Sequence, residues 1–408
     1  MRLKASSIYY ALFLCVIIGL FLGGMILFSG VNKKLESHLE IQHRLMDNAY
    51  SGIEYGLANH QELSSEPQDY SLFGSALDST TIQRRPWGAY VVIKSHAHHG
   101  RKYYDKIVMA GERDANAPNL YLPDHGRSFS ICGDTRLEGR CFIPVAGVER
   151  AYIEGQNYTG KHMIYGSEST AGRSMPPVNR VFLKEMLSIS GEIKPWENSD
   201  SVTNSFANEP VKFIDDGIVS LNNTVIRGQV FLEARDSIFV SATADLDQVI
   251  LKSRVIYVQR GFKGNVQLYA TDRIILEDGV QLTYPSVLGI MEERFPEKEN
   301  AQIFIGEKSQ VLGSVFALSD KPNFRLPVQI SIEKDAEVHG LVYSQGRTQL
   351  KGTVNGSLYT DKFYLETAAS RYENHLLNAK ILNQLPEDFV YIPLLKKENP
   401  LTKIDWLL

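Results

Sequence analysis

The sequence has too few cysteines for a disulfide-built scaffold and too little positive charge for a typical nucleic-acid-binding protein. Its 408 residues contain only three cysteines, so a disulfide-built scaffold is excluded. Lysines and arginines number 43 against 47 aspartates and glutamates, and the formal net charge of −4 gives no basic field for nucleic acid. A charged share of 22% is ordinary, so we expect a folded chain over most of the length.

Motifs of catalysis and cofactor binding are also missing. The sequence contains no complete P-loop, no Gly-x-Gly-x-x-Gly, no His-Glu-x-x-His and no Gly-x-Ser-x-Gly. The Gly-Gly-x-Gly-x-Asp repeats that bind calcium in β-rolls are absent too. The sequence therefore predicts no catalytic residue, no cofactor and no metal ligand.

A short repeat dominates the middle of the chain. Pairs of short apolar strands recur, and Ile238, Ile256 and Ile274 stand at the same place in successive repeats of about eighteen residues. Val240, Val258 and Leu276 align in the same way. Self-similarity at a short fixed period, without a helical pattern between the strands, predicts a parallel β-helix whose coils lie about 4.8 Å apart.

The later coils share a tighter formula, Val-x-Gly-x-Val/Leu-aromatic, over residues 310–316, 337–343 and 353–359. This formula resembles the Gly-rich coils of bactofilins, the polymer-forming β-helical cytoskeletal proteins. The resemblance implies the fold better than the function. A bactofilin-like polymer would need open solenoid ends.

An apolar run from Ile8 to Phe28 lies in a stretch without charged residues. About twenty apolar residues cross a bilayer, whereas the apolar region of a signal peptide is usually only about 7–15 residues long. We therefore expect a retained transmembrane anchor within residues 1–32 over a cleaved signal peptide. Gly19, Gly23 and Gly24 would let a second helix pack closely against it.

Flanking charges set the expected orientation of this anchor. Arg2 and Lys4 precede the run, whereas Lys33 and Lys34 are followed by acidic residues. The slight positive bias predicts a cytoplasmic N-terminus at the inner membrane, with the bulk of the chain periplasmic or extracellular.

A second helix is predicted over residues 33–60 from an interrupted apolar stripe. It ends in Asn48-Ala-Tyr-Ser-Gly-Ile-Glu-Tyr-Gly-Leu-Ala58, and with the basic start and apolar run it resembles minor pilins and type II secretion pseudopilins over residues 1–60. The Gly expected before the apolar run and the Glu expected near its start are both absent. The resemblance implies partners in a pilus-like or type II secretion-like system rather than an ordinary filament subunit.

The remaining ranges complete a mainly β architecture with a small α+β juxtamembrane domain. Residues 61–118 predict a β-hairpin domain that caps the solenoid, with strands at 87–94 and 103–110. The solenoid is expected over 119–366, beginning with coils in 119–177 and carrying insertions near 178–210 and 285–300. A short helix is expected at 178–188 in the first insertion. Residues 367–408 predict a capping helix at 368–382 and an extended tail.

Two sets of residues pose a question of metal or disulfide chemistry. His96, His98 and His99 lie in the expected hairpin turn, where a solvated turn is favoured over a metal site. Cys132 and Cys141 are nine residues apart around a Gly-containing turn. They form either a disulfide in an oxidising compartment or two buried thiols.

A polysaccharide-active enzyme is the main alternative to a structural protein, because glycosidases need two carboxyl groups about 5–9.5 Å apart. When the repeats are aligned, however, Glu233 stands beside Lys252 and Asp236 beside Arg254, which indicates surface ion pairs. The outward carboxylates that could form such a pair are Glu233, Asp236, Asp245, Asp247, Asp272, Glu277 and Asp278.

Aromatic side chains on the coils leave glycan binding open. Tyr257, Tyr269, Tyr343 and Tyr359 would contact a glycan if exposed, but stacking on the next coil is favoured. We therefore expect a non-enzymatic, membrane-anchored structural or scaffold protein of the cell envelope. Its expected partners are the membrane, other envelope, secretion or pilus proteins and, in the alternative, glycan, but no nucleic acid.

Overall fold

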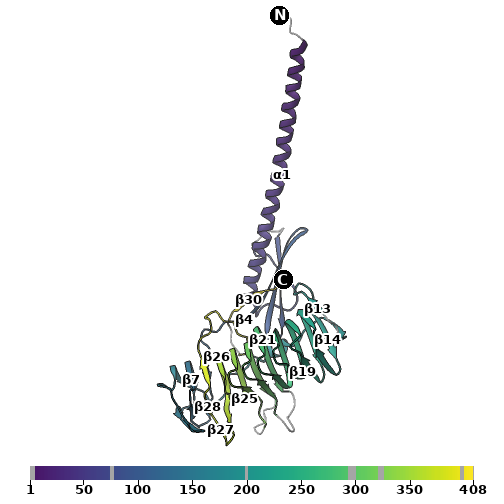
Figure 1. Ribbon diagram of the computed structural model, residues 1–408. Helices are drawn as coiled ribbons and strands as arrows, with labels where there is room; N and C mark the ends of the chain where they lie inside the picture. Colours follow the sequence, from purple (N-terminus) through teal and green to yellow (C-terminus); the bar gives the residue numbers. More distant parts are fainter. Residues whose placement is uncertain are drawn as a thin grey trace. The chain divides into compact units, whose positions relative to one another are not determined.

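The computed structural model describes residues 5–73, 78–197, 201–292, 300–319, 326–395 and 399–407 (Figure 1). Strands hold 51% of the residues and helices 15%, so the chain is mainly β, with a long apolar helix at its N-terminus. It divides into two compact units, Met1–Arg84 with Lys94–Lys106 and Arg85–Ile93 with Ile107–Leu408. The expected hairpin domain at 61–118 thus contributes residues to both units.

Five strands form one sheet, in the order β1-β2-β3-β4-β30. They are β1 Gln68–Tyr70, β2 Asp78–Trp87, β3 Tyr90–His99, β4 Lys102–Glu112 and β30 Leu401–Trp406. The hairpin of β3 and β4 confirms the two strands predicted there, but its turn is tight, with Gly100 at a φ of +59°. The extended tail expected over 385–408 is wrong for its last part, because these residues form β30, which pairs antiparallel with β4.

The helix α1 (Ala5–Ala58) is one unbroken element of 54 residues. The expected anchor and juxtamembrane helix are therefore continuous, which the absence of proline before Pro67 permits. At about 1.5 Å per residue the helix is about 81 Å long. The apolar side chains between Ile8 and Phe28 are exposed, and the segment is long and apolar enough to cross a membrane, as a signal sequence also is.

The C-terminal part of α1 packs within the first unit. Leu45, Ala49, Ile53 and Leu57 recur every four residues, on one helix face, and are buried. The helix lies so close to β3 that a Cβ on Gly52 would lie 2.2 Å from Oγ of Ser95. Glycine at this position therefore lets the helix and the strand meet.

Strands β5 to β29 and one short helix belong to the second unit. The helix is α2 Arg180–Met186. The strands are β5 Leu120–Tyr121, β6 Phe129–Cys132, β7 Arg136–Ile143, β8 Val148–Arg150, β9 Tyr152–Ile153, β10 Gln156–Asn157, β11 Tyr165–Thr170, β12 Glu192–Pro195, β13 Ser201–Asn204, β14 Val211–Asp215, β15 Ile218–Leu221, β16 Val225–Gly228, β17 Val230–Ala234, β18 Ser237–Val240, β19 Asp245–Val258, β20 Lys263–Leu276, β21 Gln281–Glu292, β22 Gln302–Ile305, β23 Gln310–Ser319, β24 Gln329–Ile332, β25 Glu337–Leu350, β26 Thr353–Glu366, β27 Arg371–Glu373, β28 His375–Leu377 and β29 Lys380–Leu382.

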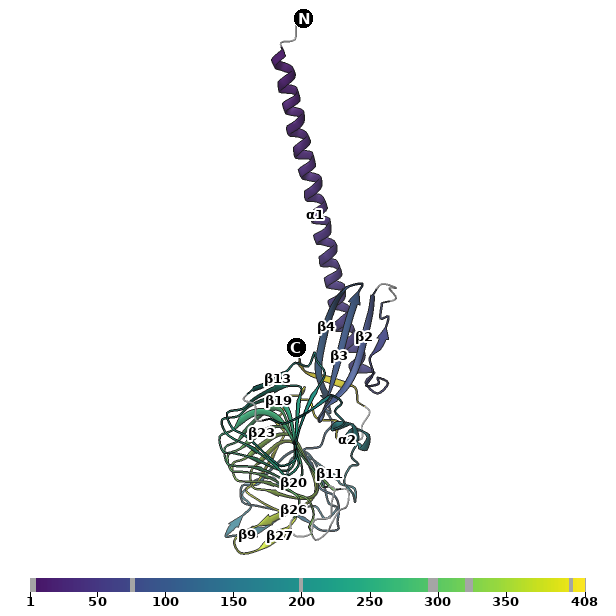
Figure 2. The ribbon, with the colours of Figure 1, turned by 90° about the vertical axis from the view of Figure 1, so that its right-hand side faces the viewer.

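Most of these strands pair in parallel with the equivalent strand of the next repeat, and the paired order closes on itself. Ile238 pairs with Ile256, Ile256 with Ile274, Ile274 with Ile303 and Ile303 with Ile330. All five side chains are fully buried. The alignment expected from the repeat is thereby confirmed. Figure 1 shows the strands side by side as successive layers, and Figure 2 looks along the stack, where they overlap.

Glycines stack where the later strands bend. Gly313 pairs with Gly340, and Gly340 with Gly356. Their φ angles are +144°, +141° and +132°, and a Cβ on Gly340 would lie 1.9 Å from the carbonyl oxygen of Gly313. The glycine of the Val-x-Gly formula therefore stands at a position where any larger side chain would clash with the neighbouring strand.

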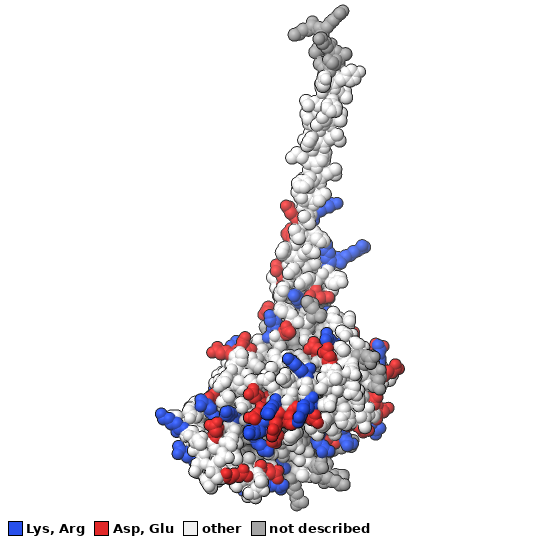
Figure 3. Space-filling view, in the orientation of Figure 1, with Lys and Arg blue, Asp and Glu red and all other residues white. Residues whose placement is uncertain are grey.

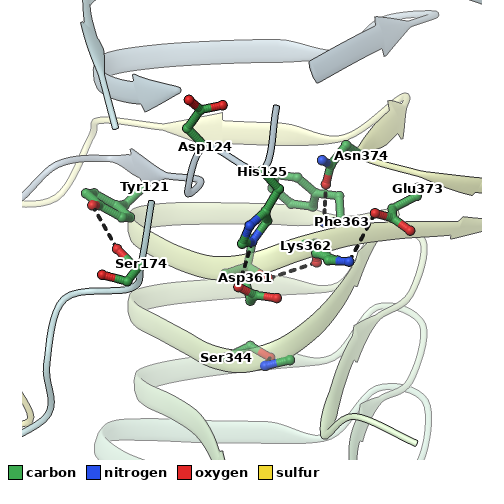
Figure 4. A network of polar contacts seen from close by, with 12 residues as sticks. Tyr121, Asp124, His125, Ser174, Ser344, Asp361, Lys362, Phe363, Glu373 and Asn374 are labelled. Carbon is green, nitrogen blue, oxygen red and sulfur yellow. Dashed lines mark hydrogen bonds and ion pairs between the residues drawn. The ribbon is translucent and has the colours of Figure 1, made fainter. Parts of the chain in front are cut away.

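The order of the strands in space differs from the order along the chain. The expectation that 119–177 holds the first coils is wrong, because β5 pairs with β26, and β7 pairs with β29 and β11. Asn119 donates from Nδ2 to the carbonyl oxygen of Gly356 at 2.9 Å. His125 also reaches Asp361 on β26, with 2.9 Å between Nε2 and Oδ1 (Figure 4). This early segment is thus hydrogen-bonded to strands from the end of the chain.

The helix predicted at 368–382 is wrong. Strands β27, β28 and β29 occupy this segment, and β28 pairs with β6. Asn374 and Asn378 adopt φ angles of +55° and +57°, which a right-handed helix does not contain. Leu376 and Ile381 are buried on strands β28 and β29. The apolar residues of this segment therefore face the core from strands, although their spacing is also compatible with a helix.

Two further segments refine the expected insertions. The helix predicted at 178–188 is confirmed as α2, whose N-terminus is capped by Asn179, which accepts from the Phe182 backbone N–H at 3.1 Å. The polar excursion expected up to 210 contains strands β12 and β13 instead. Residues 285–292 of the expected charged insertion belong to β21, and residues 293–299 lie outside the described residues.

Candidate functional site

Several of the outward carboxylates named from the sequence are engaged by cations on neighbouring strands. Glu233 lies between Lys212 and Lys252, at 2.7 and 2.9 Å, so the expected Glu233–Lys252 contact is confirmed. Arg254 reaches Asp272 at 2.9 Å, rather than the expected Asp236.

The same pattern recurs elsewhere: Asp245 pairs with Arg227, and Asp278 with Arg260. Figure 3 shows basic and acidic residues intermixed on the visible face.

Burial alone would raise the pKa of Glu233, but the hydrogen bonds from Lys212 and Lys252 outweigh it and lower the pKa below its ordinary value of 4.5. The carboxylate is thereby held in its charged form. Asp247 shows the opposite direction, because burial raises its pKa.

The four tyrosines considered as glycan contacts are engaged within the protein. Tyr257 donates its hydroxyl to Glu277, and this hydrogen bond raises the pKa of Tyr257. The rings of Tyr343 and Tyr359 lie 6.0 Å apart. Both are buried, as is Tyr269, so the expected stacking between repeats is found.

The cluster that covers these rings lies within the second unit. Tyr269, Tyr343 and Tyr359 pack with Trp87 and Tyr90. Burial raises the pKa of Tyr343 to about 12.

The three histidines lie in strand β3 rather than in a turn. His96 contacts Asp105, with 2.6 Å between Nδ1 and Oδ1, and its ring stacks on Tyr103 at 5.5 Å. His98 lies 3.4 Å from Oγ of Ser79. Within the described ranges, no group of three His, Cys, Asp or Glu side chains could hold a metal.

The sulfurs of Cys132 and Cys141 are unbonded. Cys132 donates to the carbonyl oxygen of Gln156 at 3.0 Å and packs with Ile153 and Leu365. Cys141 belongs to the main apolar core instead. The structure thus contains the second alternative drawn from the sequence, two buried thiols, because the side chains enter different clusters.

Gly19, Gly23 and Gly24 lie on the exposed apolar part of α1. A Cβ added at any of them would meet no described atom within 4 Å. The space is open, and the packing role expected for these glycines stays a prediction.

A polar hollow of about 660 Å³ lies over the outward faces of β22, β24, β25 and β26. Ligand sites commonly have volumes of about 300–1,000 Å³. Two columns of outward side chains cross it. In the first, Gln302 pairs with Gln329, and Gln329 pairs with Arg347. In the second, Phe304 pairs with Ser331, and Ser331 pairs with Gln349. By contrast, the hollow beside Tyr391 measures about 20 Å³, room for little more than a water molecule.

Hydrogen bonds between neighbouring strands organise the floor of this hollow. Gln302 and Gln329 both donate from Nε2 to Oγ of Ser331, at 3.0 and 2.9 Å. Asn300 donates to Oε1 of Gln329 at 3.3 Å. The amides are therefore held in place before any ligand arrives.

Ion pairs neutralise most of the charge of the hollow. Lys351 pairs with Glu333 at 2.9 Å, and Arg371 with Glu366 at 2.8 Å. Among the described residues, Arg347 is the remaining charged side chain along its wall. Its guanidinium lies 4.9 Å from the ring centre of Tyr364, and its Nε is buried without a hydrogen-bond acceptor in the described structure.

Sequence reasoning missed the hollow, although a signal was present. The segments Gln302-Ile-Phe-Ile, Gln329-Ile-Ser-Ile, Arg347-Thr-Gln-Leu and Lys362-Phe-Tyr-Leu repeat one inward-outward pattern. Their second and fourth residues are buried. The first and third residues of the first three segments form the two outward columns, and the sequence does not show that these columns border a hollow.

Glu233→Gln should lower stability near neutral pH. Because the folded-state pKa of Glu233 is below 4.5, its contribution is present above pH 4.5 and is lost as the pH falls through the folded value. We expect the variant to lose about 1 kcal/mol of unfolding free energy at pH 7 and to match wild type at low pH. Urea unfolding followed by circular dichroism measures this, with exposed Asp236→Asn as the control. An equal deficit at every pH would contradict the role given to the ion pairs.

The native chain should contain two unreactive thiols rather than a disulfide at 132 and 141. Burial raises the pKa of Cys141 to about 12, so little reactive thiolate forms at neutral pH. Iodoacetamide treatment of the full chain in detergent, followed by mass spectrometry, should leave both cysteines unmodified until urea is added. A Cys132–Cys141 cross-linked peptide from a non-reducing digest would contradict this.

No protein-family model matches the chain, and no curated protein matches its sequence. Among solved structures, the crystal structure of the competence-associated pilin ComZ from Thermus thermophilus is similar at 11% identity. The match covers 84% of this chain and 86% of that one at a TM-score of 0.23, too low to support an argument about fold or function.

Proposed function

We propose that this protein is a non-enzymatic scaffold of the cell envelope, anchored in the inner membrane by α1 and built on a parallel β-helix. The in-register pairing of Ile238, Ile256 and Ile274 supports a coil of about eighteen residues. Stacked coils make a stiff body, because each coil is hydrogen-bonded along its length to its neighbours.

The observation that carries the proposal is the exposed apolar segment of α1. Its side chains from Ile8 to Phe28 are uncovered, whereas Leu45 to Leu57 hold the same helix within the first unit. An uncovered apolar run of this length costs free energy in water and gains it in a bilayer. The bias of Arg2 and Lys4 favours a cytoplasmic N-terminus.

The proposed scaffold belongs to a pilus-like or type II secretion-like assembly. This rests on the resemblance of residues 1–60 to minor pilins and pseudopilins. The residues that carry the resemblance also have a structural role, since Ala49 and Ile53 are buried and Gly52 makes the close approach to β3. Close packing of a second helix on Gly19 and Gly23 would join the chain to such a partner.

The absence of enzymatic activity is part of the proposal. Glu233, Asp272 and Asp278 are held by lysine and arginine on adjacent strands, which favours a structural role for these carboxylates. Turnover of a sugar polymer by the purified chain would overturn this part.

Two arginines in the apolar run should abolish anchoring. Each arginine at a helix centre costs about 2.5–3.5 kcal/mol of membrane insertion, so Leu14→Arg with Ile18→Arg should move the chain out of the membrane fraction. Fractionation with an alkaline carbonate wash measures this, with Leu14→Ala and Ile18→Ala as the matched control. Wild type should stay in the membrane and keep tags at both ends. Loss of the N-terminal tag with release of the chain would show a cleaved signal sequence and contradict the anchor.

A further inference from the structure

We propose that the hollow over β22, β24, β25 and β26 binds an acidic polysaccharide, an extended chain of sugars that carry carboxylates. The site lies entirely within the second unit. It therefore goes beyond the scaffold proposal and does not depend on the membrane anchor.

The geometry of the hollow suits a chain rather than a compact molecule. It crosses four neighbouring parallel strands, joined by the register that links Gln302, Gln329, Arg347 and Lys362. With strands about 4.8 Å apart, the floor extends roughly 14 Å across them. One strand spacing is close to the length of one sugar along an extended chain, so each sugar would lie over one strand.

The floor offers the hydrogen-bonding groups that sugar hydroxyls require. Oγ of Ser331 accepts from both Gln302 and Gln329, which leaves its own hydrogen to be donated elsewhere. The amide of Gln349, on the same column, has no side-chain partner among the residues described and carries both donors and an acceptor. Hydroxyl groups, which donate and accept, match this mixture.

Arg347 supplies the preference for an acidic chain. The other cations along the wall, Lys351 and Arg371, are paired with carboxylates of the protein, whereas Arg347 has no carboxylate partner among the described residues. A guanidinium binds a carboxylate through two parallel hydrogen bonds. A carboxylate of the ligand would take the place of this absent partner by binding the partly exposed guanidinium.

Two rings add apolar contact area to this polar surface. Tyr364 and Phe304 both border the hollow and are partly exposed. The C–H face of a sugar ring can pack on such an aromatic ring while its hydroxyls reach the amides. Tyr364 lies beside Arg347, so a carboxylated sugar would contact both.

Single-stranded nucleic acid is a poorer match for this surface. Its backbone needs a line of free cations with aromatic rings for successive bases. Here two of the three cations are already paired with carboxylates.

Binding is tested with the full chain in detergent and alginate oligosaccharides, which are uronate chains, by isothermal titration calorimetry. Neutral dextran oligosaccharides and single-stranded DNA serve as comparison probes. We expect alginate to bind and dextran to bind at least about tenfold more weakly, because it lacks carboxylates. Arg347→Gln, which keeps a polar side chain but removes the charge, should weaken alginate binding at least about tenfold.

Two variants separate the site from general effects on folding. Gln349→Glu, which places a negative charge on the floor, should also weaken alginate binding. Arg254→Gln removes an exposed arginine of the Asp272 ion pair and should leave binding unchanged. Each variant is compared with wild type by circular dichroism and thermal unfolding, and only variants with wild-type spectra are scored.

Absence of alginate binding, equal loss in Arg254→Gln and Arg347→Gln, or equal binding of dextran would overturn the proposal. Tighter binding of DNA than alginate, lost in Arg347→Gln, would overturn it in favour of a nucleic-acid site. None of these results alters the expected membrane fractionation, so the failure of this proposal is distinguishable from failure of the anchor.

Discussion

Inward aliphatic side chains that stack in register are the contact on which the second unit depends. Ile238, Ile256, Ile274, Ile303 and Ile330 form one continuous column across five parallel strands. Because side chains alternate between faces along a strand, a slip of one residue would place a whole set of these groups in water. The column therefore fixes the register of these parallel strands, and the register decides which outward side chains meet.

The outward positions are used in three different ways. Over β17 to β20 they carry opposite charges that pair between strands, as Glu233 does with Lys212 and Lys252. On another face, Tyr269, Tyr343 and Tyr359 are buried against residues such as Trp87 and Tyr90. Over β22 to β26 they form the polar hollow. One repeating interior thus supports a solvated wall, an internal contact and a candidate binding surface.

The sequence predicted those features that a local period can specify. The apolar helix, the aligned isoleucines and the stacked Val-x-Gly formula were all visible as repeats of residue type. The pairing of β5 with β26 and of β7 with β29 was not, because the choice of partner depends on edges brought together by the whole chain. The helix predicted near Leu376 was wrong because Asn374 and Asn378 adopt left-handed backbone angles that their sequence neighbourhood does not reveal. The hollow was missed for a related reason, since its residues come from five strands, β22, β24, β25, β26 and β27, and from segments beside them.

The register of neighbouring strands is the most direct test of this account. Phe239 pairs with Tyr257, and Tyr257 with Ile275, all at outward positions. In a background where Cys15, Cys132 and Cys141 are replaced by alanine, Phe239→Cys with Tyr257→Cys should form a disulfide under mild oxidation. Adjacent strands bring the two Cα atoms about 4.8 Å apart, within the range for a disulfide. Phe239→Cys with Ile275→Cys, two strands apart, should remain reduced. Mass spectrometry of non-reducing digests reads both results, and a cross-link in the second pair without one in the first would contradict the stacked register.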